Sequence, residues 1–267
     1  MRLLRKRNLL FLQKMIKEVF MNSIDCALYI ENLTVSFDGF KAVDEVNIYV
    51  KKGSVHVVIG PNGAGKTTLL DLICGKTKPT AGSIQFDKHE LTTMHEQEIV
   101  QVGVGRKFQT PSIYPALTVF QNLEVSYPKG RGVWGALSFK RDQAVIDRIH
   151  EISEMVYLSD KLQTRGELLS HGQKQWLEIG MLLIADLQMI LLDEPVAGMS
   201  VHERKQTAEL IKIISKNRSV LVIEHDMNFV REIAHRVNVM HQGRVIAEGS
   251  METVERNEKV IEVYLGH

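Results

Sequence analysis

The sequence between positions 60 and 67 reads Gly60-Pro61-Asn62-Gly63-Ala64-Gly65-Lys66-Thr67, which fits the pattern G-x-x-x-x-G-K-[S/T]. A short apolar run at 55–59 precedes this loop, and the pattern after it predicts a helix from Lys66 to about Cys74. Glycines let successive N–H groups point at an anion, and the helix adds its positive N-terminal end. The unit predicts a nucleotide site in which Lys66 reaches the β- and γ-phosphates and the Thr67 hydroxyl binds Mg²⁺.

A second apolar run, 189–192, ends in the acids Asp193 and Glu194. A buried strand rarely ends in two carboxylates without a task. We expect Asp193 to hold the shell of Mg²⁺, and Glu194, near the γ-phosphate, to polarise an attacking water. Together with the phosphate loop, this pair predicts nucleotide hydrolysis.

The pattern around these motifs alternates between strands and helices. We expect strands at 29–37, 46–50, 55–59, 83–86, 189–192, 219–223, 236–240 and 244–247. Helices are expected at 92–100, 201–216 and 227–234, and residues 111–185 are mainly helical in pattern, with a 3.6-residue period over 142–157. The order indicates a helical insertion within an α/β frame of parallel, apolar strands.

Composition excludes several classes of protein. Lys and Arg number 33 against 32 Asp and Glu, for a net charge of +1, which argues against a dedicated nucleic-acid binder. A hydrophobic content of 44% excludes disorder. Cys26 and Cys74 form no CxxC pair, so neither a zinc site nor a disulfide framework is predicted, and a reducing cytoplasm fits best. No uninterrupted apolar run reaches the roughly 18–20 residues that span a bilayer.

The first twenty residues are basic, with Glu18 as their one acid. Apolar residues recur there at helical spacing, which predicts a short amphipathic helix on anionic lipid or on a partner. The alternative, which we favour, is an upstream extension without a role, because Met21 could equally serve as a start.

Further strings make residues 28–267 resemble the ABC ATPases. Leu169-Ser170-His171-Gly172-Gln173 resembles the LSGGQ signature element of that family. Gln109, His225 and Phe37 resemble its Q-loop glutamine, its switch histidine and the aromatic residue on which adenine stacks. All these elements stand in the order that the family has.

Finer strings resemble the branched-chain amino-acid importer branch, for example Glu194-Pro195-Val196-Ala197-Gly198-Met199 and the ending Val263-Tyr264-Leu265-Gly266. Within that branch, Ser36-Phe37-Asp38-Gly39-Phe40 and the run from Ser170 to Glu178 resemble the ATPase subunit of urea importers. Two residues depart from the general pattern of the family. His171 replaces the first glycine of LSGGQ, and Ser200 stands where many members have the D-loop aspartate.

The resemblance implies a P-loop NTPase of the ABC cassette type, in the α/β class. Its RecA-like core has a mostly parallel sheet, with an antiparallel β subdomain and an inserted α-helical subdomain. The expected divisions are a basic amphipathic N-terminal extension (1–25), the first part of the nucleotide-binding core (26–110), the helical subdomain ending in the signature element (111–185), and the second part of the core with the C-terminal tail (186–267).

The resemblance also implies the residues of the site. Catalytic roles are expected for Glu194, His225 and Gln109. Coordination of Mg²⁺ is expected for Thr67, Gln109 and Asp193. Contacts to ATP are expected from Phe37, Gly60, Pro61, Asn62, Gly63, Ala64, Gly65, Lys66, Thr67 and Thr68, and, across a dimer, from Ser170, His171, Gly172 and Gln173.

The function that the resemblance implies is ATP hydrolysis that energises an importer, with urea or short amides as the expected substrate. The alternatives are a branched-chain amino-acid importer and a lipopolysaccharide-export type ATPase. An ABC ATPase of DNA repair or translation, from another functional class, would carry paired cassettes, a coiled coil or zinc motifs. The implied partners are a second cassette, permease subunits and a periplasmic or extracellular substrate-binding protein. The implied location is the cytoplasmic face of the inner membrane.

Overall fold

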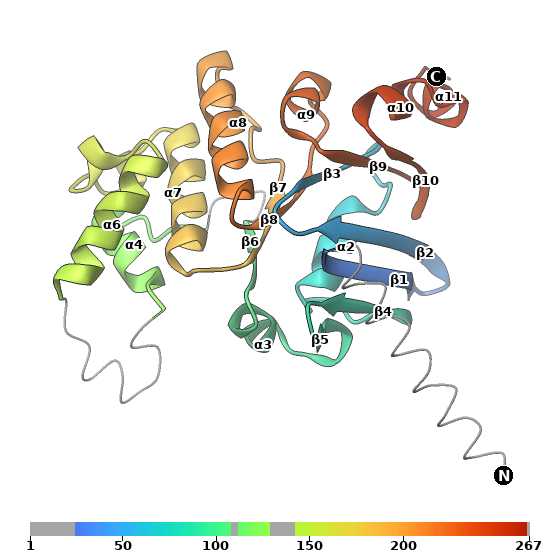
Figure 1. Cartoon of the computed structure of the whole chain (residues 1–267), viewed down its shortest axis with the longest axis horizontal. Helices are drawn as coiled ribbons and strands as arrows, with labels where there is room; N and C mark the ends of the chain where they lie inside the picture. The colour runs from blue at the N-terminus through green and yellow to red at the C-terminus, as the bar shows by residue number, and fades with distance from the viewer. Residues whose placement is uncertain (1–24, 108–111, 129–141, 266–267) are drawn as a thin grey trace, which may run out of the picture.

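A computed structural model describes residues 25–107, 112–128 and 142–265 of the chain, and two sheets organise them (Figure 1). The six-stranded sheet has the order β10-β9-β3-β8-β7-β6. Its strands are β3 (Val55–Ile59), β6 (Val104–Lys107), β7 (Met189–Asp193), β8 (Ser219–Ile223), β9 (Arg236–His241) and β10 (Arg244–Gly249). All neighbours pair in parallel except β9 and β10. The central strands β3, β7 and β8 are buried at every residue, which explains their continuous apolar runs.

The second sheet is antiparallel, with the order β2-β1-β4-β5. Its strands are β1 (Cys26–Phe37), β2 (Phe40–Lys51), β4 (Ala81–Phe86) and β5 (His89–Glu90). A tight turn joins β1 to β2, and both Asp38 (φ 49°) and Gly39 (φ 89°) lie in the left-handed region that such hairpins require. The helix α2 (Lys66–Ile73) packs its apolar face into the core that this sheet shares with one face of the six-stranded sheet.

The helical part occupies the side of the molecule beyond β6 and β7 in Figure 1. It contains α4 (Val119–Ser126), α6 (Gln143–Met155) and α7 (His171–Ile184). Buried residues of these helices share one core with the outer face of the six-stranded sheet and with α8 (Val201–Ser215) and α9 (Met227–Ile233). The indole of Trp176 on α7 donates to Thr207 Oγ1 on α8 at 2.9 Å, which fixes the two helices against each other.

The structure corrects some of the predicted elements. The helix expected at 92–100 is a 3₁₀ turn (Leu91–Thr93) followed by α3 (Glu96–Gln101), which His95 begins with a capping box. Strands β5 and β6 and the helices α10 (Met251–Glu255) and α11 (Glu258–Leu265) were not predicted. The helix that carries the signature element, α7, begins at His171 because Ser170 is its N-cap.

Two predictions fall outside the described residues: the amphipathic helix within residues 1–20, and Gln109. Among the helices that the structure describes, none is long and apolar enough to span a membrane.

Candidate functional site

Three of the predicted motifs, the phosphate loop, the acid pair and the segment with His225, follow neighbouring strands at the carboxyl edge of the six-stranded sheet. Strands β3, β8 and β7 are neighbours and run in parallel, so the segments that follow them leave from the same edge. The phosphate loop follows β3, His225 follows β8 after Glu224, and Asp193 ends β7 with Glu194 directly behind it. The carboxyl ends of parallel strands are the usual location of ligand sites in α/β proteins.

Two glycines of the loop are required by close backbone approach. A Cβ on Gly60 (φ 153°) would lie 2.2 Å from the carbonyl oxygen of Met240, and one on Gly65 (φ 99°) would lie 2.3 Å from that of Ala42. Gly63, in contrast, has no neighbour among the described residues within 4 Å of such an atom, so this part of the loop is not packed against them. The loop is therefore held at its ends and open at its middle, as a cradle for a phosphate must be.

Lys66 places its ammonium on this loop. Its Nζ donates to the carbonyl oxygens of Gly60 at 2.8 Å and Pro61 at 3.0 Å, and the residue is only 8% exposed. Burial lowers the pKa of Lys66, and the negative charges of Glu194 and Asp193 partly oppose this effect. A bound phosphate would offset the desolvation of this cation, which favours an anionic ligand here.

Asp193 has a cationic partner that the sequence did not reveal. Its Oδ2 accepts from Nη2 of Arg106 at 2.9 Å, and both side chains are 4% exposed. Arg106 also donates to Oδ1 of Asp71 on α2, so β6, β7 and the helix after the phosphate loop are tied together. The bonds to Asp71 and Asp193 raise the pKa of Arg106, although burial acts in the opposite direction.

The residues present fit Mg²⁺. The Thr67 hydroxyl at the exposed start of α2 and the carboxylate of Asp193 are the oxygen ligands that this ion prefers. Within the described ranges, no group of three or more His, Cys, Asp and Glu side chains could hold a metal ion. An ion bound here would therefore depend on nucleotide phosphates for much of its coordination, as is usual for Mg²⁺.

Glu194 and His225 face each other. His225 Nδ1 lies 3.5 Å from Oε1 of Glu194, and the imidazole is 66% exposed while the carboxylate is 21% exposed. The backbone of Glu194 has φ 46°, and its N–H donates to Ile223 O at 3.0 Å. A left-handed glutamate is uncommon, and such conformations cluster at functional sites.

Glu224 is a residue whose role the sequence analysis missed. Its carboxylate is buried and accepts three backbone N–H groups, from Val196 at 3.4 Å, His225 at 2.8 Å and Asp226 at 3.2 Å. Burial raises the pKa of Glu224, and the three bonds counteract this effect. Glu224 thus fixes the segments that follow both Glu194 and the β8 strand. The available signal was the acid at the end of an apolar strand, the same signal that singled out Asp193.

Lys107 is also absent from the predicted site. Its side chain is fully buried, and Nζ lies 3.5 Å from Asp193 O and 3.9 Å from Oε2 of Glu178 on α7. Burial lowers the pKa of Lys107, while Glu178 and Asp193 oppose this effect. No sequence signal could have revealed this residue, because a lysine at a strand end is expected at the surface.

The signature residues Ser170, His171, Gly172 and Gln173 form the first turn of α7 with its N-cap. Ser170 Oγ accepts from Gln173 N at 3.2 Å, and Gln173 Oε1 accepts from Ser170 N at 3.0 Å, which is a capping box. The side chain of His171 contacts the loop that follows Glu194 in the same chain. Phe37 is 49% exposed at the end of β1, as a stacking surface would be.

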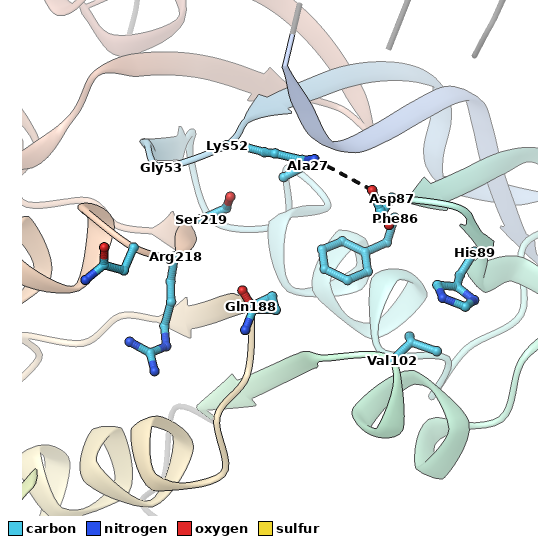
Figure 2. A pocket seen from close by; sticks show the side chains of 11 residues that line it. Ala27, Lys52, Gly53, Phe86, Asp87, His89, Val102, Gln188, Arg218 and Ser219 are labelled. Carbon is cyan, nitrogen blue, oxygen red and sulfur yellow. Dashed lines mark ion pairs between the residues drawn. The ribbon is translucent and has the colours of Figure 1, made fainter. Parts of the chain in front are cut away.

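A cavity of about 330 Å³ lies at the opposite end of the strands (Figure 2). Residues just before β3 and β7 and at the start of β8 line it, among them Gly53, Gln188 and Ser219. An ion pair between Lys52 and Asp87, at 3.6 Å, joins two of its lining residues. None of the predicted site residues that the structure describes lines this cavity, so it is separate from the described part of the candidate site.

Comparison with known proteins gives consistent matches. The model of the family "ABC transporter" matches residues 43–197, and that of "Branched-chain amino acid ATP-binding cassette transporter" matches residues 244–267. The probable branched-chain amino acid transport ATP-binding protein LivG of Archaeoglobus fulgidus is 34% identical over 245 residues, which cover 90% of this chain and 95% of the relative.

Solved structures are similar over nearly the same length. A nucleotide-free ATP-binding cassette from an ABC transporter superposes with a TM-score of 0.80 at 32% identity, covering 91% of this chain and 100% of that one. A dimeric cassette in a post-hydrolysis state, bound to ADP and inorganic phosphate, superposes with a TM-score of 0.72 at 25% identity and covers 84% of this chain and 98% of that one.

Proposed function

The chain belongs to the ABC transporter family of ATP-binding cassettes, and from this we propose that it is the ATPase subunit of an importer for branched-chain amino acids. The family membership itself establishes the cassette fold and an ATPase coupled to transport. The observation that carries the substrate class is the match of the C-terminal residues 244–267 to the branched-chain amino-acid model, together with the name of the LivG relative.

Nucleotide binding is assigned to the open cradle after β3. The first turn of α2 has backbone N–H groups without intrahelical partners, and the Lys66 ammonium is already held beside them by Gly60 and Pro61. Gly60 to Thr68 would surround the phosphates, and the exposed ring of Phe37 would stack on adenine. Thr67 and Asp193 would hold Mg²⁺, which neutralises phosphate charge when bound. Gln109, proposed for the same ion, lies outside the described residues.

Hydrolysis is assigned to Glu194 and His225. Glu194 is partly exposed, so its carboxylate can reach a water, and its left-handed backbone is of the kind that clusters at functional sites. His225 lies beside it at the same edge, where its ring can contact the γ-phosphate. Glu224, with its three backbone hydrogen bonds, holds both residues at this separation.

The proposed partners complete the site. In a head-to-tail dimer with a second cassette, Ser170, His171, Gly172 and Gln173 of one chain would face the ATP of the other. The dimeric relative bound to ADP and phosphate supports this arrangement. The helical part, proposed as a subdomain over 111–185 between core parts 26–110 and 186–267, would receive permease subunits. The chain would then sit at the cytoplasmic face of the membrane through them, with a substrate-binding protein on the other side.

The comparisons favour branched-chain amino acids over urea, which was the first substrate that the sequence suggested. Urea is kept as a second candidate because the strings at 36–40 and 170–178 resemble urea-importer subunits.

The test is to purify the tagged chain from membranes with its bound subunits, identify these by mass spectrometry, and reconstitute the complex. Leucine, isoleucine or valine, presented on the binding protein, should stimulate ATP hydrolysis, and a complex with Glu194→Gln serves as the inactive control. Stimulation by urea or short amides alone would support the second candidate. Co-purification with an exporter would contradict both candidates.

A further inference from the structure

Within one chain, the signature turn is bonded to the loop that follows the proposed catalytic base. The signature turn is the start of α7, and the loop runs over residues 195–200 between Glu194 and α8. In the proposed dimer these two segments serve different ATP molecules, so a rigid connection between them has consequences for both sites. The inference below rests on that proposed dimer.

The first connection is a hydrogen bond from His171. Its Nε2 lies 3.1 Å from the carbonyl oxygen of Ala197, which can only accept, so the ring donates to this oxygen in the tautomer that carries its proton on Nε2. The side-chain amide of Gln175, one turn along α7, lies 3.2 Å from the same ring nitrogen. The ring also packs on Gly198, where a Cβ would lie 3.2 Å from Cδ2 of His171. Gly198 has φ 70°, so a side chain there is disfavoured by its backbone as well.

The second connection joins the first turns of α7 and α8. A Cβ on Gly172 would lie 2.4 Å from Oε1 of Glu203, so a larger residue at this position would have to displace the carboxylate. The other oxygen of Glu203 accepts from the backbone N–H and the hydroxyl of Ser200, each at 2.8 Å. These bonds lower the pKa of Glu203, so the carboxylate stays charged beside the N-terminus of α7.

We propose that His171 is a positioning residue that locks the signature turn to the 195–200 loop, so that each chain transmits the state of its own ATP site to its partner's ATP. We call the contacts of His171 with Ala197 and of Gly172 with Glu203 the lock. A shift of the loop when Glu194 engages its nucleotide moves Ala197 and Ser200, and the lock carries that shift into the first turn of α7. The two departures from the family pattern, His171 and Ser200, thus belong to one connection.

The geometry offers a matched pair of variants. In His171→Gln the side-chain amide nitrogen stands close to the position of Nε2 and can still donate to Ala197 O. In His171→Asn the amide is one methylene shorter and cannot reach it. Both variants are neutral and polar, so a difference between them reports the hydrogen bond rather than the loss of an imidazole.

The first measurement is amide hydrogen exchange of residues 196–200 in the nucleotide-free full chain. His171→Asn should exchange about fivefold faster there than the parental chain, which is the effect of one net hydrogen bond, and His171→Gln should stay within about twofold. Equal exchange in the two variants overturns the lock. This measurement requires no ATP hydrolysis, so its result does not depend on the proposed function. Failure of the proposed function would show separately, as an absence of ATP turnover in the parental chain.

The second measurement is ATP hydrolysis as a function of ATP concentration. The parental chain and His171→Gln should give a Hill coefficient above one, and His171→Asn a value near one with a several-fold lower kcat, because its two sites would act independently. The dissociation constant of the monomeric chain for ATP should change less than about twofold in His171→Asn, because this ATP binds to the chain's own phosphate loop, whereas His171 contacts the 195–200 loop. His150→Asn, an exposed histidine on α6, is the control and should behave as the parental chain. A parental Hill coefficient of one, or equal coefficients in all variants, overturns the coupling.

Discussion

At the scale of single residues, the ionisable side chains of the site differ in how far they are exposed to solvent. Lys66 is nearly buried and bonded to loop carbonyls, whereas His225 is 66% exposed and Glu194 is 21% exposed. The cation is thus fixed before any ligand arrives, while the two groups assigned to hydrolysis face solvent. Preorganised charge of this kind stabilises developing charge without reorganisation at the moment of reaction.

Lys66→Ala should lower the rate of ATP turnover by at least about 100-fold and weaken ATP binding about 10- to 100-fold. Both effects follow because a charge-assisted interaction with the phosphates is lost. Turnover is measured by phosphate release and affinity by calorimetry. The control is Lys88→Ala, a change of an exposed lysine beyond β4 that should leave both values unchanged. Normal affinity and turnover in Lys66→Ala would contradict the assignment of the phosphate loop.

Glu224→Gln should lower the free energy of unfolding by about 2 kcal/mol, because an amide cannot accept all three backbone N–H groups that the carboxylate accepts. The kcat should fall about tenfold while ATP affinity is retained, since Glu194 and His225 lose their common anchor. Denaturant unfolding and steady-state kinetics measure the two effects. Glu232→Gln, on the exposed face of α9, is the control. Unchanged stability in Glu224→Gln would show that the anchor is dispensable.

At the scale of elements, the contact between the two sheets includes a buried histidine. His56 on β3 is 2% exposed and meets the ring of Tyr49 on β2 edge-on, with the centroids 6.2 Å apart. Burial, followed by the nearby charges of Arg236 and His235, lowers the pKa of His56 to about 4. Its Nε2 accepts a long bond of 3.5 Å from Lys51 N, so the neutral ring is the form that fits here.

The sheet contact should therefore weaken in acid. Above pH of about 6.5 His56 is neutral in both the folded and the unfolded chain and adds nothing to the pH dependence. Below that pH the unfolded chain takes up the proton first, because the folded pKa is about 4, so stability falls over this window. Between about pH 7 and pH 4.5 the contribution of His56 is a loss of about 2 kcal/mol.

The measurement compares guanidinium unfolding of the parental chain and of His56→Gln across this pH range. The variant keeps an acceptor for Lys51 N but cannot take up a proton, so its stability should fall by about 2 kcal/mol less than that of the parental chain. The comparison uses the difference between the two pH profiles, because carboxylates also titrate at the lower end of the range. Parallel profiles would show that His56 has no part in the acid sensitivity.

At the scale of the whole molecule, the proposed dimer assigns two half-sites of one chain to different nucleotides. The phosphate loop, Asp193, Glu194 and His225 meet at the edge formed by β3, β8 and β7. The signature turn instead contacts the 195–200 loop of its own chain. In the proposed arrangement a complete site needs a second cassette, and the solved cassette bound to ADP and phosphate is a dimer.

Glu194→Gln should bind ATP but hydrolyse it about 10²- to 10⁴-fold more slowly, because the group that polarises water is lost while Lys66, Thr67 and Asp193 remain. With the γ-phosphate uncleaved, contacts from Ser170 and Gly172 of the partner chain should persist and favour a closed dimer. Light scattering after size-exclusion chromatography, with and without MgATP, should show a shift to twice the monomer mass.

Two results would contradict this prediction. If Glu194→Gln hydrolysed ATP at the parental rate, another residue would have to be the base, and His225 would be the first candidate. Loss of turnover without a dimer would show that this chain closes only against a different cassette.

The sequence by itself determined the motifs and the strands that carry them. Residues 60–67 and the apolar runs at 55–59, 189–192 and 219–223 predicted the phosphate loop and three central strands, since a strand buried on both faces must be apolar throughout. The resemblance to the ABC ATPases, with all the motifs in the order of that family, then predicted the cassette fold. Each of these motifs and strands is specified by a few consecutive residues, so it can be predicted without a structure.

Only the tertiary structure decided which charges are neighbours. Nothing local shows that Arg106 meets Asp193 and Asp71, that Lys107 lies buried between Asp193 and Glu178, or that His171 reaches Ala197. Strand β6 is only four residues long and carries two of these cations, so its sequence gave no strand signal. A buried charge is stable only when distant elements bring it a partner, and the partner is set by the order of strands in the sheet rather than by sequence spacing.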